Sequence, residues 1–139
     1  YTPDAQNFSP LLSWGDVPAN TESFVLICED PDAPFKVCVH WVLYNIPKGV
    51  TGLKEGISGQ ELADLGIKKG INDFGKMEYQ GPCPPPGKPH KYIFKLYALD
   101  RVLDLSGGAN KKDIIEAIQG HILAEAKITA IYQKPKDSQ

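Results

Sequence analysis

The chain has 139 residues, of which 42% are hydrophobic and 23% charged, and its formal net charge at pH 7 is −2. These proportions are typical of a globular protein and exclude a disordered chain or a coiled coil. The charge balance also provides no basic stripe of the kind that nucleic-acid-binding proteins use. The length predicts a single domain, residues 1–139, that buries a core without metal or disulfide staples.

No apolar run approaches the roughly 18–20 residues that cross a membrane, and no secretory leader is visible, so we expect no integral membrane association. Cys28, Cys38 and Cys83 form an odd set with no Cys-x-x-Cys spacing. This pattern favours structural thiols in a reducing, cytoplasmic compartment. A disulfide between Cys28 and Cys38 is left open, because both fall in strand-like runs.

The first half of the chain predicts two strands separated by turns. Residues 1–22 are rich in turn formers and predict a loop. Ser23–Glu29 is rich in β-branched and aromatic residues and predicts a strand, which the turn at 30–34 ends. Val37–Ile46 predicts a second strand that is apolar on both faces and therefore central in its sheet.

The middle of the chain is richer in glycine and proline. Residues 48–81 predict a long loop with one turn of helix at 60–65, and loops of this length are usually functional or mobile. A proline-rich turn follows at Gly81–Pro89, and Tyr92–Asp100 predicts a third strand.

One convincing helix is expected late in the chain, over Lys111–Ala126. Asn110 is its predicted N-cap, with Asp113 three residues on, and apolar residues recur at helical spacing. Lys127–Tyr132 then predicts a final strand. Strands outnumber helices and lack crossover helices between them, which indicates a mainly β fold, a sandwich or a barrel.

Familiar catalytic and metal motifs do not match. Gly81–Lys88 (GPCPPPGK) has one residue too many for a P-loop, and its prolines offer no N–H groups to phosphate. His40, His90 and His121 are too widely spaced for a helical zinc pair, and no nucleophile elbow or metalloprotease motif is present. We therefore predict no metal, no cofactor and no catalytic residue.

The remaining polar residues gather at predicted strand ends. Asp30 and Asp32 flank Pro31 in a rigid turn, and His40 lies in the second strand. His90 and Tyr92 are two residues apart, which places both on one face of the third strand. Each has a structural alternative when taken alone: a core histidine, a turn carboxylate or an ordinary strand start. We expect His121 to be a packing or surface residue.

Together these motifs resemble the phosphatidylethanolamine-binding protein family, in particular its bacterial and archaeal Raf-kinase-inhibitor-like branch. The resemblance is carried, in order along the chain, by DPDAP at 30–34, His40-Trp41, GINDFG at 70–75, GPCPP at 81–85 and His90-Lys91-Tyr92. It implies a mainly β, Greek-key fold of two antiparallel sheets with one late α-helix. It also implies a further strand before residue 1, so that one sheet edge would be exposed.

The resemblance further implies a small pocket for phosphate, phosphorylated head groups or a phosphorylated residue. Asp30, His40, His90 and Tyr92 would line it, Gly81 and Pro82 would form its wall, and we add Asp32 from the same turn. Because histidine and tyrosine donate to phosphate oxygens, this implies non-enzymatic binding of an anionic or phosphorylated ligand.

Two other functions stay open at this point. One is a regulator that inhibits a protein partner such as a kinase or protease. The other is a hydrolase or phosphotransferase that uses His40 or His90 as base or nucleophile. A homodimer is also left open.

Overall fold

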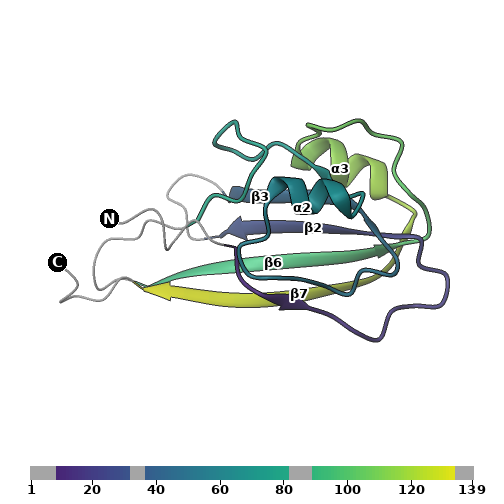
Figure 1. Ribbon diagram of the computed structural model, residues 1–139, viewed down its shortest axis with the longest axis horizontal. Coiled ribbons are helices and arrows are strands. Elements are labelled where there is room, and N and C mark those ends of the chain that lie inside the picture. Colours follow the sequence, from purple (N-terminus) through teal and green to yellow (C-terminus); the bar gives the residue numbers. More distant parts are fainter. Residues whose placement is uncertain (1–8, 32–36, 82–88, 134–139) are drawn as a thin grey trace.

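A computed structural model describes the backbone of residues 9–31, 37–81 and 89–133, with side chains described except at 89–90 and 130–133. Two antiparallel sheets and two helices make up this part of the chain (Figure 1). The elements are β1 (Leu12–Ser13), β2 (Ser23–Asp30), β3 (Cys38–Pro47), β4 (Gly52–Leu53), α2 (Gly59–Asp64), β5 (Lys68–Lys69), β6 (Pro89–Leu99), α3 (Lys111–Ile118) and β7 (Ile122–Gln133).

The larger sheet has the strand order β5-β3-β2-β6-β7, and every neighbouring pair is antiparallel. Figure 1 shows β3, β2, β6 and β7 side by side, with both helices beside β3. The strand β2 is central and is buried over its whole length. The predicted mainly β fold with two antiparallel sheets is therefore confirmed, although the most central strand is β2 and not the next one along the chain.

Successive residues of β2 point to opposite faces of this sheet and enter two separate cores. We call them the first core and the second core. Phe24, Leu26 and Cys28 belong to the first core, which β1, β4 and α2 complete. Val25 and Ile27 belong to the second core, which α3 covers with its two fully buried isoleucines.

The predicted strands agree with β2, β3 and β6 to within three residues at each end, but β7 begins at Ile122, five residues before the predicted start at Lys127. The expected turn of helix at 60–65 is α2, which begins with a capping box between Ser58 and Glu61. The loop predicted at 48–81 also contains the short strands β4 and β5. Within the loop predicted at 1–22, β1 pairs with β4.

The predicted helix over Lys111–Ala126 is wrong in its second half. Asn110 and Asp113 form the expected capping box, but α3 ends at Ile118. Gly120 has φ of +83°, and the His121 amide donates to the Ile118 carbonyl, so the chain turns sharply there. The apolar residues from 122 onward therefore continue in the long strand β7 and not in a helix.

A buried carboxylate ties α3 to the sheet. Glu29, at the end of β2, lies 2.7 Å from the Lys95 ammonium on β6 and also pairs with Lys111, the first residue of α3. Burial alone would raise the pKa of the Glu29 carboxyl, but the hydrogen bonds from Lys111 and Lys95 lower it below its usual value. The same contact raises the pKa of Lys95.

Candidate functional site

A bulge in β3 places His40 on the first-core side of the sheet. Cys28 pairs with Trp41 while the next residue of β2, Glu29, pairs with Val39, so His40 is the extra residue. Trp41 enters the first core, Val39 enters the second, and the His40 ring contacts Tyr92 of the first core. The bulge therefore turns two consecutive side chains toward the same face, as β-bulges next to functional sites often do.

Two polar contacts hold the buried imidazole of His40. Its Nδ1 atom lies 2.6 Å from the Gln80 carbonyl oxygen, and its Nε2 atom lies 3.3 Å from the Tyr92 hydroxyl. A carbonyl oxygen only accepts hydrogen bonds, so Nδ1 carries the proton in the neutral ring. Nε2 is then the acceptor, and the Tyr92 hydroxyl donates to it.

A turn centred on Asn72 covers this pair. The buried Asn72 amide donates to the carbonyls of His40 and Glu78, and its oxygen accepts from the backbone N–H groups of Phe74 and Lys76. One side chain thus satisfies four backbone groups and fixes the loop on β3. The Gln80 amide donates to the His40 carbonyl at 3.1 Å, which completes this attachment.

Gly70 sets the point where this loop leaves the sheet. Its amide donates to the Val42 carbonyl at 2.8 Å, and a Cβ atom there would lie 2.4 Å from the Ala109 carbonyl oxygen and 2.5 Å from the Val42 side chain. Only glycine permits so close a backbone approach. The loop over His40 is therefore positioned by residue 70 as well as by Asn72.

Aromatic rings flank the histidine. Tyr92 packs edge-to-face on His40 with ring centroids 4.5 Å apart, and Phe74 does so at 4.9 Å. Tyr92 is buried, whereas 47% of the Phe74 surface is exposed. The imidazole and phenol dipoles therefore lie in a poorly solvated environment, which strengthens their electrostatic interactions.

Two more of the predicted site residues lie beside this pair. Asp30 is buried at the end of β2 on the same face as Cys28, one position past the pair Glu29–Ile93 and therefore next to Tyr92 along the sheet. Gly81 is buried and directly follows Gln80. Burial, with the charges of Glu29 and Asp30, raises the pKa of the Cys28 thiol. Cys28 is a free thiol, so the Cys28–Cys38 disulfide does not form.

The other predicted site residues are not described as fully. Asp32 and Pro82 lie outside the described residues, and so does Cys83. His90 lies in β6, two residues before Tyr92, and its backbone pairs with Tyr132 of β7. The side chain of His90 lies outside the described part of the chain.

Sequence reasoning assigned no role to Asn72, Phe74 and Gln80. The motif GINDFG at 70–75 was part of the family resemblance and carries a clear turn signal, Asn-Asp followed by Gly. That signal predicts a turn. It does not predict that the turn lies over His40, because the contact joins residues more than thirty positions apart.

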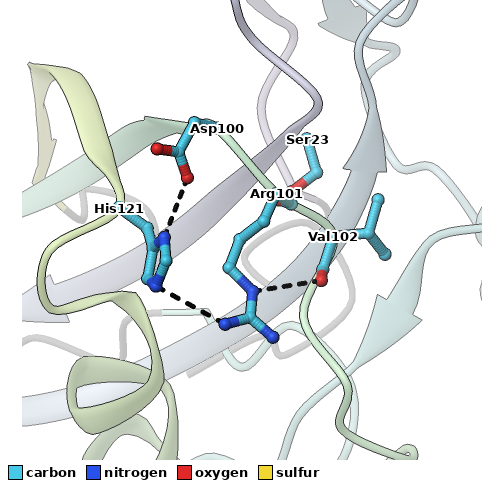
Figure 2. A network of polar contacts seen from close by, with 5 residues as sticks. All are labelled: Ser23, Asp100, Arg101, Val102 and His121. Atoms are coloured by element: carbon cyan, nitrogen blue, oxygen red, sulfur yellow. Dashed lines mark hydrogen bonds and ion pairs between the residues drawn. The ribbon is translucent and has the colours of Figure 1, made fainter.

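A second polar cluster lies at the opposite end of β6, after Leu99. The His121 Nδ1 atom lies 2.9 Å from an Asp100 carboxylate oxygen, and its Nε2 atom lies 3.4 Å from an Arg101 guanidinium nitrogen (Figure 2). Ser23 donates to the backbone carbonyl of Arg101 at 2.6 Å. His121 is therefore a surface residue just after α3, one of the two expected alternatives.

Over the described residues, no group of three or more His, Cys, Asp or Glu side chains is arranged to hold a metal ion. No helix within the described ranges has the length and apolarity needed to span a membrane.

Comparison with known proteins points to one family. The family model described as phosphatidylethanolamine-binding protein matches residues 1–133. The UPF0098 protein of Methanothermobacter thermautotrophicus is 52% identical over 134 residues, which cover 96% of this chain and 88% of that protein. The UPF0098 protein of Aquifex aeolicus is 46% identical and is covered over 79% of its length.

Two solved structures have a similar fold. A putative phosphatidylethanolamine-binding protein homologue of Chlamydia trachomatis, CT736, superposes with a TM-score of 0.82 at 39% identity, over 91% of this chain and 82% of that one. Escherichia coli YbcL, described as a new member of the mammalian family of this type, superposes with a TM-score of 0.80 at 36% identity. That match covers 91% of this chain and 80% of YbcL.

Proposed function

This chain belongs to the phosphatidylethanolamine-binding protein family, and on that premise we propose that it binds small anions or phosphorylated compounds, without converting them, at the site around His40 and Tyr92. The observation that supports this most directly is the 2.6 Å contact between the Nδ1 atom of His40 and the Gln80 carbonyl oxygen, which assigns the proton of the neutral ring to Nδ1. It leaves Nε2, beside the Tyr92 hydroxyl, as the atom that changes protonation.

The His40–Tyr92 pair can change from a state in which the two side chains hydrogen-bond to each other to a state in which both donate hydrogen bonds to an anion. When the ring is neutral, the Tyr92 hydroxyl donates a hydrogen bond to Nε2. When the ring takes up a second proton, Nε2–H becomes a donor, and the Tyr92 hydroxyl can turn to donate elsewhere. Two donors then face an incoming anion, one of them charged, and charge-assisted hydrogen bonds are about twice as strong as neutral ones.

The site is also preorganised for this purpose. The bulge, the Asn72 turn and the edge-on contact of Tyr92 hold both donors before a ligand arrives. Holding donors in place in advance reduces the entropy that binding costs. The resemblance adds His90, Asp32 and Pro82 to the proposed ligand-binding residues, beside Asp30 and Gly81.

Calorimetric titration with sodium sulfate tests this proposal, because sulfate keeps its charge between pH 5 and 8. We expect saturable binding to the wild-type protein, a loss of at least about tenfold in affinity in His40→Gln, and a loss of about threefold to tenfold in Tyr92→Phe. His121→Ala, which alters the exposed histidine, is the matched control and keeps wild-type affinity. Undetectable binding, or equal losses in His40→Gln and His121→Ala, contradicts the proposal.

A second measurement separates binding from catalysis. The wild-type protein is incubated with a phosphate monoester such as phenyl phosphate, and release of phenol and phosphate is followed over hours. We expect binding without release. Turnover that His40→Gln abolishes would instead identify a hydrolase.

A further inference from the structure

A hollow beside α2, on the first-core side of the sheet, is lined by one cationic and one anionic side chain. It has a volume of about 230 Å³, and Lys69 and Glu78 line it together with the aromatic pair Trp41 and Tyr79. His40 and its ring partners are not among the described residues that line it. This hollow, which we call the α2 groove, therefore has a lining of its own.

The backbone of Lys69 is held on both sides. In β5 it pairs with Leu43 of β3, and its carbonyl accepts from the Gly108 amide at 2.9 Å. Leu43 belongs to the first core, and directly paired residues of neighbouring strands point to the same face, so the Lys69 side chain points toward the α2 groove. A Cβ atom at Gly59, the first residue of α2, would lie 2.8 Å from the Lys69 ammonium nitrogen. The ammonium group therefore lies against the start of α2, where a glycine leaves room for it.

The segment that carries Glu78 is held as well. The Glu78 carbonyl accepts from the side-chain amide of Asn72 at 2.8 Å, and the next side chain, Tyr79, packs edge-on against Trp41 with ring centroids 5.3 Å apart. Among the described residues, no ion pair joins Lys69 or Glu78 to a partner. Two opposite charges thus line one small cavity without touching each other, and a small molecule between them can contact both.

From this arrangement we infer that the α2 groove binds a small zwitterion, a free amino acid with an apolar side chain. The ligand's carboxylate meets Lys69 and its ammonium group meets Glu78, and hydrogen bonds between charged groups are the stronger kind. The ligand's side chain packs on the apolar part of the wall, formed by Ile57, Leu62 and Met77. The volume is below the roughly 300–1,000 Å³ of pockets that hold drug-sized molecules, which favours a ligand of this size.

Four ligands separate the two charges and the side chain. L-leucine carries all three, 4-methylpentanoate lacks the ammonium group, 3-methylbutylamine lacks the carboxylate, and glycine lacks the side chain. They are titrated at pH 7 into protein labelled with nitrogen-15, and binding is followed by NMR chemical shifts. We expect each single-charge analogue to bind at least about tenfold more weakly than leucine, and glycine about threefold to tenfold more weakly.

Three variants assign each charge to its partner. Lys69→Gln should remove the preference for leucine over 3-methylbutylamine, and Glu78→Gln should remove the preference for leucine over 4-methylpentanoate. Lys68→Gln is the matched control, since Lys68 is the neighbouring lysine of β5 and pairs with Tyr44 of the second core, on the opposite face. It should keep both preferences.

The outcomes do not depend on sulfate binding at His40. The inference is overturned if leucine causes no saturable shifts, if either single-charge analogue binds as tightly as leucine, or if Lys68→Gln weakens leucine binding as much as Lys69→Gln does. Glycine binding as tightly as leucine overturns the role given to the apolar side chain. Because the analogues are compared on the wild-type protein, the test stands even if a variant fails to fold.

Discussion

A histidine with both ring nitrogens in polar contacts lies near each end of β6, His40 from β3 and His121 from the turn after α3, yet the two sites differ in solvent exposure and in partners. At one end, which we call the site end, His40 is buried between aromatic rings and contacts a carbonyl and a hydroxyl. At the far end, His121 is partly exposed and lies between the Asp100 carboxylate and the Arg101 guanidinium.

The difference shows what prepares a histidine to bind an anion. At the far end, Asp100 already supplies the negative charge that a protonated imidazole would attract, and water screens the cluster. At the site end, the ring contacts the Gln80 carbonyl and the Tyr92 hydroxyl, and the buried Asp30 lies beside Tyr92; a second proton on His40 would supply positive charge to an incoming anion. Burial then strengthens that attraction.

Among the substitutions considered, Asn72→Ala, at the site end, should cause the largest loss of stability. Asn72→Ala removes four hydrogen bonds to backbone groups, of which the His40 carbonyl alone still accepts from the Gln80 amide among the described contacts, and we expect the free energy of unfolding to fall by about 3 kcal/mol. Sulfate affinity should fall with it, because the loop no longer holds Gln80 against His40. Urea denaturation measures the first effect and calorimetry the second.

Asn110→Ala is the matched control for that variant. It removes one helix cap of α3 and should cost about 1 kcal/mol without changing sulfate affinity. If the Asn72 and Asn110 variants lose similar stability, the Asn72 turn is not the anchor that its contacts suggest.

The substitution Glu29→Gln should cause the next largest loss of stability. Glu29→Gln leaves Lys95 and Lys111 without a carboxylate, and since both lysines are partly solvated we expect a loss of about 2 kcal/mol at pH 7. The pKa of Glu29 is lowered in the folded state, so its stabilising contribution is present above its unfolded pKa and is lost as the pH falls through its folded pKa.

Urea denaturation of wild type and Glu29→Gln at pH 7, 5 and 3 checks the sign of this effect. The difference in unfolding free energy should be largest at pH 7 and shrink toward pH 3. A difference that grows as the pH falls would contradict the assignment of the lowered pKa to Glu29.

We expect the pH dependence of sulfate affinity to come from His40, at the site end, and not from His121. Because binding is proposed to require a proton on Nε2 of His40, we expect tighter binding at acid pH than at pH 7.5. His40→Gln should remove this dependence, and His121→Ala should leave it intact. A dependence that follows His121 would reverse the comparison between the two histidines.

The smallest expected change in stability is that of His121→Ala, at the far end. His121→Ala removes an exposed ion pair, and such pairs are worth about 0–1 kcal/mol, so we expect a change near 0.5 kcal/mol. Raising the salt concentration to 1 M should remove most of that change, because exposed charges are screened. Thermal melts at low and high salt measure it.

Local patterns predicted much of this fold. The buried runs of β2, β3 and β6 and the capping box at Asn110 follow from hydrophobic pattern and cap chemistry alone. The end of α3 was missed, because Ile122 continues the helical spacing while Gly120 at positive φ breaks the backbone. The backbone conformation of Gly120 depends on tertiary structure, and the spacing of apolar residues does not predict it.

The site was predicted in its residue types but not in its assembly. His40 and Tyr92 were expected to line one pocket, and in the structure their side chains are in contact, because the bulge in β3 turns His40 toward the first core. The bulge itself leaves no signal in the sequence. The partners Gln80, Asn72 and Phe74 were missed for a related reason: their contacts with His40 depend on how a loop folds back across a strand, and not on local propensity.

The most direct test of the central claim is the protonation of the two histidine rings during sulfate binding. Nitrogen-15 NMR of labelled imidazoles at pH 7 distinguishes protonated from unprotonated nitrogens in each ring. The structure predicts that His40 keeps its Nδ1 proton throughout and gains an Nε2 proton as sulfate saturates, while His121 does not change with it. If the His40 nitrogens are unaltered at saturating sulfate, or if Nδ1 loses its proton, the account of anion binding at this site is contradicted.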